Sequence, residues 1–270
     1  MLMGALWELV SFALRSAATR NQQSSALQFV STLLILLAPM WINAFVYMVL
    51  GRMIYFFIPA QKVYGIKGIS IAKIFVWLDV LSFLTQLGGG SMIDSHNSAT
   101  TQMLGIHIYM GGIGFQQFCI LLFAAIAVKF FFIMRSSETS PSNQILDTTR
   151  RGWKKLLIVL FITLALITMR IIFRLIEFAS GLDPDKNPIP YHEVYFYVLD
   201  AAPMLVALVL LNFIHPGHVL VGEGSEFPKG PTRKEKKAAK KAKKEEKKME
   251  KERKKRGYGH VSEEESVQMV

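Results

Sequence analysis

Charged residues stand inside the most apolar stretches of this sequence, where they could bind a polar solute within a membrane. The segment RIIFRLIEF (170–178) directly follows LLIVLFITLALITM (156–169) and carries Arg170, Arg174 and Glu177. Because a helix turns by about 100° per residue, these three side chains share one face. A charge that faces lipid at the bilayer centre costs about 2.5–3.5 kcal/mol. We therefore predict that this face points into the protein.

Polar side chains share a helix face in two further apolar stretches. The first face holds Asp79, Ser82, Phe83, Gln86 and Gly90. The second holds Glu193, Tyr197 and Asp200, with Pro203 placed to kink the helix. Acidic residues outnumber basic ones over the three faces, which favours a cationic or zwitterionic group in a polar cavity between helices. The alternative is that buried ion pairs only fix how the helices pack.

Two weaker signals accompany these faces. Glu8 and Arg15, seven positions apart near the start of the sequence, could add another charge pair. Gly111, Gly112 and Gly114 predict a helix whose backbone lies close to that of its neighbour.

The histidines lack the spacing that a metal enzyme needs. An intramembrane zinc hydrolase uses about three protein ligands and a water position. His215 and His218 of HPGH lie at one end of the last apolar stretch, and His192 lies at the other end, about 30 Å away by helix rise. His215, Pro216 and Gly217 instead predict a helix stop. The sequence therefore predicts no metal, no cofactor and no catalytic residue, and an intramembrane hydrolase is the least favoured function.

Five apolar stretches are long enough to cross a hydrocarbon core about 30 Å thick as helices. They cover residues 26–50, 74–93, 107–128, 156–178 and 194–214, and a sixth, 2–15, is barely long enough. The alternating ten-residue segments of a membrane β-barrel do not occur in the sequence. With 51% apolar residues, the chain is predicted to be an all-α, polytopic transmembrane helix bundle with six spans.

Basic residues in the connections predict the orientation of the bundle. The connections 51–73 and 129–155 are rich in Lys and Arg, whereas 89–106 has none and 179–193 has one. Because cytoplasmic loops carry the excess of Lys and Arg, these two basic connections and the C-terminus are predicted to be cytoplasmic.

The net charge of +11 resides in one segment. Residues 229–256 hold 16 Lys and Arg against 5 Asp and Glu, so the rest of the chain is balanced. We predict two domains: a multi-pass transmembrane domain at 1–221 and a Lys/Glu-rich cytoplasmic tail at 222–270, either disordered or a single exposed helix. The predicted partner of this tail is the anionic cytoplasmic leaflet rather than nucleic acid.

Five segments carry a family resemblance. They are APMWINAFVYMVLGR (38–52), DVLSFLTQLGGG (79–90), RIIFRLIEFASG (170–181), HEVYFYVLDAAPM (192–204) and HPG (215–217). In this order and spacing they resemble the fungal lipid-translocating exporter family, also called the aminocholesterol-resistance-like family, which includes the sphingoid long-chain base resistance protein. The resemblance covers residues 8 to about 220.

The resemblance implies a fungal protein, usually of seven helices, that is associated with export or flop of sphingoid bases and with resistance to toxic amphiphiles. WELVSFALR (7–15) resembles the second helix of that family, so the chain is expected to lack the first.

Together, the buried charges and the resemblance predict a transporter of amphiphilic lipids, above all sphingoid long-chain bases, in the fungal plasma membrane. The family's motif positions fall on His215 and on the residues predicted to contact the headgroup, which are Asp79, Gln86, Arg170, Arg174, Glu177, Glu193 and Asp200. The alternative is a lipid-responsive receptor or regulator of the seven-helix type, which does not transport and signals through its tail.

Overall fold

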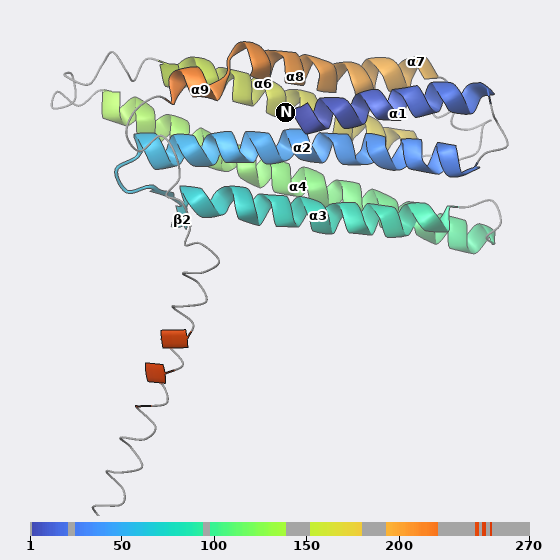
Figure 1. Cartoon of the computed structure of the whole chain (residues 1–270), viewed down its shortest axis with the longest axis horizontal. Coiled ribbons are helices and arrows are strands. Elements are labelled where there is room, and N and C mark those ends of the chain that lie inside the picture. The colour runs from blue at the N-terminus through green and yellow to red at the C-terminus, as the bar shows by residue number, and fades with distance from the viewer. Residues whose placement is uncertain are drawn as a thin grey trace, which may run out of the picture. The chain divides into compact units, whose positions relative to one another are not determined.

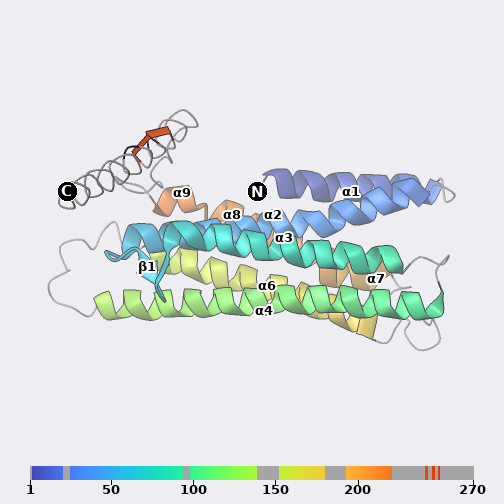
Figure 2. The ribbon, with the colours of Figure 1, turned by 90° about the horizontal axis from the view of Figure 1, so that it is seen from below.

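The computed structural model describes residues 2–20, 25–93, 98–138, 152–179 and 193–220, together with five positions of the tail. The chain divides into two units, Met1–Phe227 and Pro228–Val270. The described residues of the first unit form a bundle of long helices that run alongside one another (Figures 1 and 2). In the second unit, the described positions are helical and exposed: Lys241, Ala242, Glu245, Glu246 and Met249.

Five long helices form the first part of the bundle: α1 (Leu2–Arg20), α2 (Ser25–Phe57), α3 (Gly68–Met92), α4 (Ala99–Glu138) and α6 (Gly152–Ala179). The last span consists of α7 (Glu193–Phe196), the π-helix η3 (Tyr197–Ala201) and α8 (Ala202–Phe213), and the short α9 (Pro216–Val219) follows it. The closest neighbours in space are α1 and α2, α2 and α3, α3 and α4, α4 and α6, and α6 and α8.

Five described helices are long and apolar enough to cross a membrane: Leu33–Phe57, Gly68–Met92, Ala99–Ser137, Gly152–Ala179 and Val194–Phe213. They coincide with the five predicted spans, so the all-α membrane bundle is confirmed. The predicted sixth span corresponds to α1, which is not one of these five. Figures 1 and 2 show α1 lying along the N-terminal half of α2.

Several helices extend beyond the predicted spans, α2 and α4 the furthest. α4 has 40 residues, a length of about 60 Å at 1.5 Å per residue and about twice the hydrocarbon thickness. α2 continues through Arg52 to Phe57, so this arginine lies in a helix and not in a connection. The predicted spans were shorter than these helices because hydropathy marks where lipid ends, whereas a helix can continue into water.

A small β-hairpin joins α2 to α3, and it was not predicted. Its strands are β1 (Lys62–Val63) and β2 (Ile66–Lys67), paired antiparallel. Tyr64 and Gly65 form the turn with φ angles of 50° and 78°. Such a turn is usually signalled by Asn-Gly or Asp-Gly, and Tyr-Gly does not give that signal.

α3 and α4 approach closely at glycines. A Cβ atom on Gly89 would lie 2.5 Å from the backbone nitrogen of Tyr109, and one on Gly105 would lie 2.8 Å from the carbonyl oxygen of Gly89. One on Gly112 would lie 2.8 Å from Cγ of Gln86. Close helix contact was predicted at Gly111, Gly112 and Gly114, but only Gly112 of these three makes it, because Gly111 and Gly114 have no neighbour within 4 Å of an added Cβ.

Candidate functional site

Two arginines of α6 share one aspartate of η3. Arg170 donates from Nε to Oδ1 of Asp200, and Arg174 donates from Nη2 to Oδ2 at 2.9 Å. Arg174 also donates from Nη1 to Oε2 of Glu177 at 3.2 Å. Arg170 reaches across to α2, where its Nη2 lies 3.4 Å from the carbonyl oxygen of Ile35. The predicted face of α6 therefore does point inward, and its charges are paired across helices.

α1 brings two further charges to this cluster. Glu8 interacts electrostatically with Arg170 and Asp200, and Arg15 with Glu177. The guanidinium of Arg15 lies 4.6 Å from the ring centre of Phe196, and that of Arg174 lies 5.5 Å from the same ring. Cation–π contacts of this kind help to hold the two positive charges near one another.

We call the six charged side chains Glu8, Arg15, Arg170, Arg174, Glu177 and Asp200 the charge cluster. It holds three acids and three bases, so its formal charges cancel. The acidic surplus predicted for a cationic ligand is therefore not available here, because the carboxylates of Asp200 and Glu177 already accept hydrogen bonds from arginine.

Reciprocal hydrogen bonds hold α1 against α2. Ser11 Oγ donates to the carbonyl oxygen of Ser31 at 2.7 Å, and Ser31 Oγ donates to that of Ser11 at 3.0 Å. Trp7 packs edge-on against Trp41 with ring centres 5.8 Å apart. These contacts place Glu8 and Arg15 at the charge cluster.

Asp79 lies apart from the arginines. Its Oδ2 accepts hydrogen bonds from Asn43 Nδ2 at 3.1 Å and from the Tyr47 hydroxyl at 3.0 Å. Its Oδ1 is buried without a hydrogen-bond partner, as is Oδ1 of Asn43. We call these three residues the Asp79 triad. The sequence predicted that Asp79 contacts the same headgroup as Arg170 and Arg174, but in the structure its hydrogen-bond donors come from α2 and not from these arginines.

A chain of amide and hydroxyl groups extends along α3 towards the charge cluster. Ser82 donates to the carbonyl oxygen of Gly112 at 2.7 Å, and Gln86 Nε2 lies 3.0 Å from Ser82 Oγ. Gln86 Nε2 also lies 2.9 Å from Oε1 of Gln116 on α4. The predicted face of α3 is therefore buried, with Gly89 continuing it in place of the predicted Gly90.

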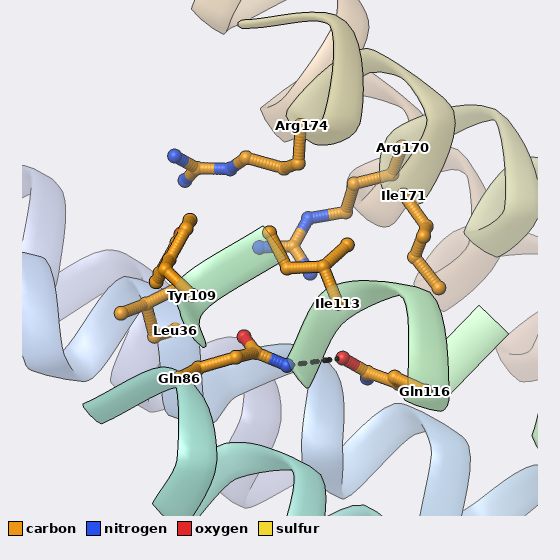
Figure 3. A pocket seen from close by; sticks show the side chains of 8 residues that line it. All are labelled: Leu36, Gln86, Tyr109, Ile113, Gln116, Arg170, Ile171 and Arg174. Atoms are coloured by element: carbon orange, nitrogen blue, oxygen red, sulfur yellow. Dashed lines mark hydrogen bonds between the residues drawn. The ribbon is translucent and has the colours of Figure 1, made fainter. Parts of the chain in front are cut away.

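A small cavity lies where this chain meets the arginines (Figure 3). Its volume is about 20 Å³, which is room for about one water molecule. Five of its eight lining residues are polar, and the full set is Leu36, Gln86, Tyr109, Ile113, Gln116, Arg170, Ile171 and Arg174. Figure 3 shows Gln86 and Gln116 on one side and the two guanidinium groups on the other.

The cavity brings together three of the predicted site residues, Gln86, Arg170 and Arg174. Glu177 and Asp200 do not line the cavity but bind its arginines as members of the charge cluster. Asp79 does not line it either, because it precedes Gln86 by seven residues, about 10 Å along α3. Glu193 begins α7, but its side chain lies outside the described residues.

Three residues of the Asp79 triad and the cavity were not predicted from the sequence as site residues. Asn43 and Tyr47 lie one helical turn apart in the strongly apolar α2, and Tyr109 precedes the glycine run of α4. A polar residue in the middle of an apolar span was the available signal, since Asn43 would be costly against lipid. Tyrosine gives no comparable signal because it also packs in apolar cores.

The last span contains an irregularity that positions Asp200. In η3 the Ala202 N–H donates to the carbonyl oxygen of Tyr197, five residues back. Pro203 has no N–H to donate, so the carbonyl of Leu199 loses its usual partner one turn earlier. Pro203 was predicted to kink this helix, and the structure has a π-helix just before it. As a result Asp200 is buried, whereas Tyr197, predicted on the same face, is 43% exposed.

His215 acts as a cap at the end of this span. α8 ends at Phe213, and the Nδ1 atom of His215 accepts a hydrogen bond from the Gly217 N–H at 3.1 Å at the start of α9. The predicted helix stop is therefore confirmed. Within the described residues, no group of three or more His, Cys, Asp or Glu side chains is placed to hold a metal ion.

Comparison with known proteins gives one family and several relatives. The family described as RTA1 like protein matches residues 1–223. The chain is 45% identical over 242 residues to the "Probable lipid transporter atnI" of Emericella nidulans, covering 87% of this chain and 62% of that protein. It is 31% identical over 216 residues to "Protein RTA1" of Saccharomyces cerevisiae, covering 80% and 64%.

A more distant relative carries a more specific name. The "Sphingoid long-chain base transporter RSB1" of Saccharomyces cerevisiae is 23% identical over 258 residues, covering 83% of this chain and 65% of that protein. The chain thus spans slightly less than two thirds of the length of these relatives. No solved structure matches the chain.

Proposed function

Because the chain belongs to the RTA1-like family, we propose that it is a translocator of amphiphilic lipids, with sphingoid long-chain bases as the substrate class. The names of two relatives, a probable lipid transporter and a sphingoid long-chain base transporter, support this proposal. The five apolar helices support it too, because they make the chain an integral membrane protein.

The observation that carries the proposal is the polar cavity between the apolar spans of the bundle. Arginine side chains supply only hydrogen-bond donors, whereas the glutamine side chains supply both donors and acceptors. The headgroup of a sphingoid base carries hydroxyl groups and an ammonium. In the proposed site the hydroxyls accept hydrogen bonds from Arg170 and Arg174, and the ammonium donates to the amide oxygens of Gln86 and Gln116. The hydrocarbon chain stays in the lipid.

The small size of the cavity requires a conformational change for passage. A volume of about 20 Å³ holds water and not a lipid headgroup. In the proposed cycle the helices separate along the row of Gln86, Gln116, Arg170 and Arg174, and the headgroup enters between them. The charge cluster remains paired during this step, because breaking buried ion pairs costs about 3–5 kcal/mol.

We propose the fungal plasma membrane as the site of action, with resistance to toxic amphiphiles as the physiological result. The basic tail is proposed to bind the anionic cytoplasmic leaflet. Its described residues are exposed, which supports a surface role.

The test uses liposomes that contain only the purified chain. A fluorescent sphingoid base is placed in one leaflet, and its appearance in the other is followed with a membrane-impermeant quencher. We expect Gln116→Leu to slow translocation about tenfold, the effect of one lost hydrogen bond worth about 1.4 kcal/mol. Gln117→Leu is the matched control, because Gln117 is the next residue on α4 but contacts Thr168 instead of the cavity.

Equal rates for the two variants would overturn the assignment of the cavity. A wild-type chain that folds but does not accelerate translocation over protein-free liposomes would overturn the proposed function. That result would favour a lipid-responsive regulator.

A further inference from the structure

The Asp79 triad contains an acid whose hydrogen bonds are one-sided. Both donors, from Asn43 and Tyr47, point to the same oxygen, Oδ2. The other oxygen, Oδ1, is buried and has no hydrogen-bond partner. All three side chains are at most 2% exposed. An ionised carboxylate in this place would keep one oxygen unsatisfied in an apolar interior, which is costly.

The surroundings of Asp79 contain no basic partner within the part of the chain that the structure describes. α3 packs against α2, α4 and β2. The titratable groups that face Asp79 are Tyr47 from α2 and Cys119 from α4, and both are neutral acids. Lys67 of β2 precedes Asp79 by twelve residues, about 18 Å along the helix axis. Asp200 differs in this respect, because two arginines bind it.

A proton resolves the one-sided arrangement. Protonation of Oδ1 removes the unpaired charge and turns a bare acceptor into a donor. The unpartnered Oδ1 of Asn43 is then an acceptor available within the same triad. Asp79 also lies at the middle of the 25-residue α3, where water is furthest away.

We propose that Asp79 is a proton-binding site at the centre of the bundle, protonated in this closed structure and ionised when the bundle opens to water. A hydronium ion on one side of the membrane supplies the proton, which binds Oδ1. Water on the other side accepts it after the helices rearrange. Asn43 and Tyr47 hold Oδ2 in both states. Use of this proton to drive lipid movement rests on the proposed translocation.

The first experiment detects the proton without any transport. Infrared spectroscopy of the purified full-length chain in detergent records the C=O stretching band of a protonated carboxylic acid at neutral pH. We expect Asp79→Asn to remove one such band. Tyr47→Phe should keep the band but shift its frequency, because the acid remains and loses a hydrogen bond. Asparagine has the shape of the protonated acid, so the variant is expected to fold, which size-exclusion chromatography checks.

The second experiment measures coupling in liposomes with the membrane potential held at zero. The probe is a fluorescent trimethylammonium derivative of a sphingoid base, whose charge does not change with pH. It keeps the hydroxyl groups that bind Arg170 and Arg174 and approaches the amide oxygens of Gln86 and Gln116 through its charge alone, so its translocation by the wild-type chain without a gradient is measured first. If one proton moves per lipid, each pH unit of gradient shifts the steady-state ratio between leaflets about tenfold. We expect this shift for the wild-type chain and a ratio near one for Asp79→Asn.

The infrared experiment tests the proton site, and the liposome experiment tests coupling, so each can contradict its own hypothesis without the other. An unchanged infrared spectrum in Asp79→Asn would overturn the proton site, whatever the transport result. A gradient response that persists in Asp79→Asn would overturn its role in coupling. Absence of translocation by the wild-type chain would count against the proposed function, and the infrared result would still decide the proton site.

Discussion

Asp200 lies between Arg170 and Arg174, and each of its two carboxylate oxygens accepts a hydrogen bond from a different guanidinium. One acid on the last span thus binds two bases on α6. Because the side chains are buried, removal of this single carboxylate would leave two positive charges without their main partner. The relationship makes Asp200 the central residue of the charge cluster.

We expect Asp200→Asn to lower the free energy of unfolding by about 3–5 kcal/mol, the cost of breaking a buried ion pair. The measurement is thermal unfolding of the purified chain in detergent, together with its abundance in membranes. Lys155→Gln is the control, since it removes one charge from an exposed position on α6, the helix that carries Arg170 and Arg174. Equal stability of the two variants would show that the pairing contributes nothing.

The contact between α3 and α4 predicts opposite effects for neighbouring glycines. Gly89→Ala places a methyl group 2.5 Å from a backbone nitrogen, so the helices must separate, at a cost of about 1–3 kcal/mol. Gly88→Ala meets nothing within 4 Å and should stabilise α3 by up to about 1 kcal/mol through helix propensity. Melting temperatures of both variants test this, and a drop of similar size in each would contradict the observed packing.

The π-helix predicts that one residue can be removed from the last span. Deletion of Val198, which is exposed, converts η3 to an α-helical turn and leaves Asp200 and α8 in place. The preceding residues rotate by about 100°, so Phe196 leaves Arg174. Deletion of Val206, a similarly exposed residue in regular helix, shifts the buried face of α8 instead.

We therefore expect a smaller loss of thermal stability for the Val198 deletion than for the Val206 deletion. The opposite order would mean that the π-helix is needed for folding of the span.

The orientation predicted from the basic connections can be tested with the single cysteine. Cys119 is buried, and Cys119→Ser gives a background without thiols. In intact cells, a membrane-impermeant thiol reagent should label Ser98→Cys, which precedes α4, but not Ala60→Cys, which lies between α2 and the hairpin. Both positions are exposed, so permeabilised cells should show equal labelling. The reverse pattern would invert the proposed topology.

The inward faces of α3 and α6 could be predicted from the sequence because each obeys regular helix geometry and because lipid penalises charge. Asp79, Gln86 and Arg170 were identified in this way, and all three are buried. Their partners could not be predicted, since one sequence does not state which helices are neighbours. Asp79 was therefore predicted to contact the same headgroup as Arg170 and Arg174, although its donors are Asn43 and Tyr47 of α2.

The last span shows a different limit of the sequence pattern. A constant rotation of 100° per residue places Tyr197 beside Asp200, but η3 changes the rotation between them. The signal was Pro203, which indicates that a backbone hydrogen bond is missing and does not say how the helix adapts. Close packing at the glycines of α4 was likewise predicted. The sequence did not show which of these glycines face α3, because that depends on how α4 is rotated about its own axis.

α4 is one uninterrupted helix from Ala99 to Glu138, and it touches α3 closely at Gly112. Glu138 lies 26 residues beyond that contact, about 39 Å along the axis. A tilt of about 5° around Gly112 would therefore displace Glu138 by about 3 Å, a simple consequence of helix length. A small change of tilt beside the cavity would thus be multiplied along this helix into a larger displacement of its C-terminal end.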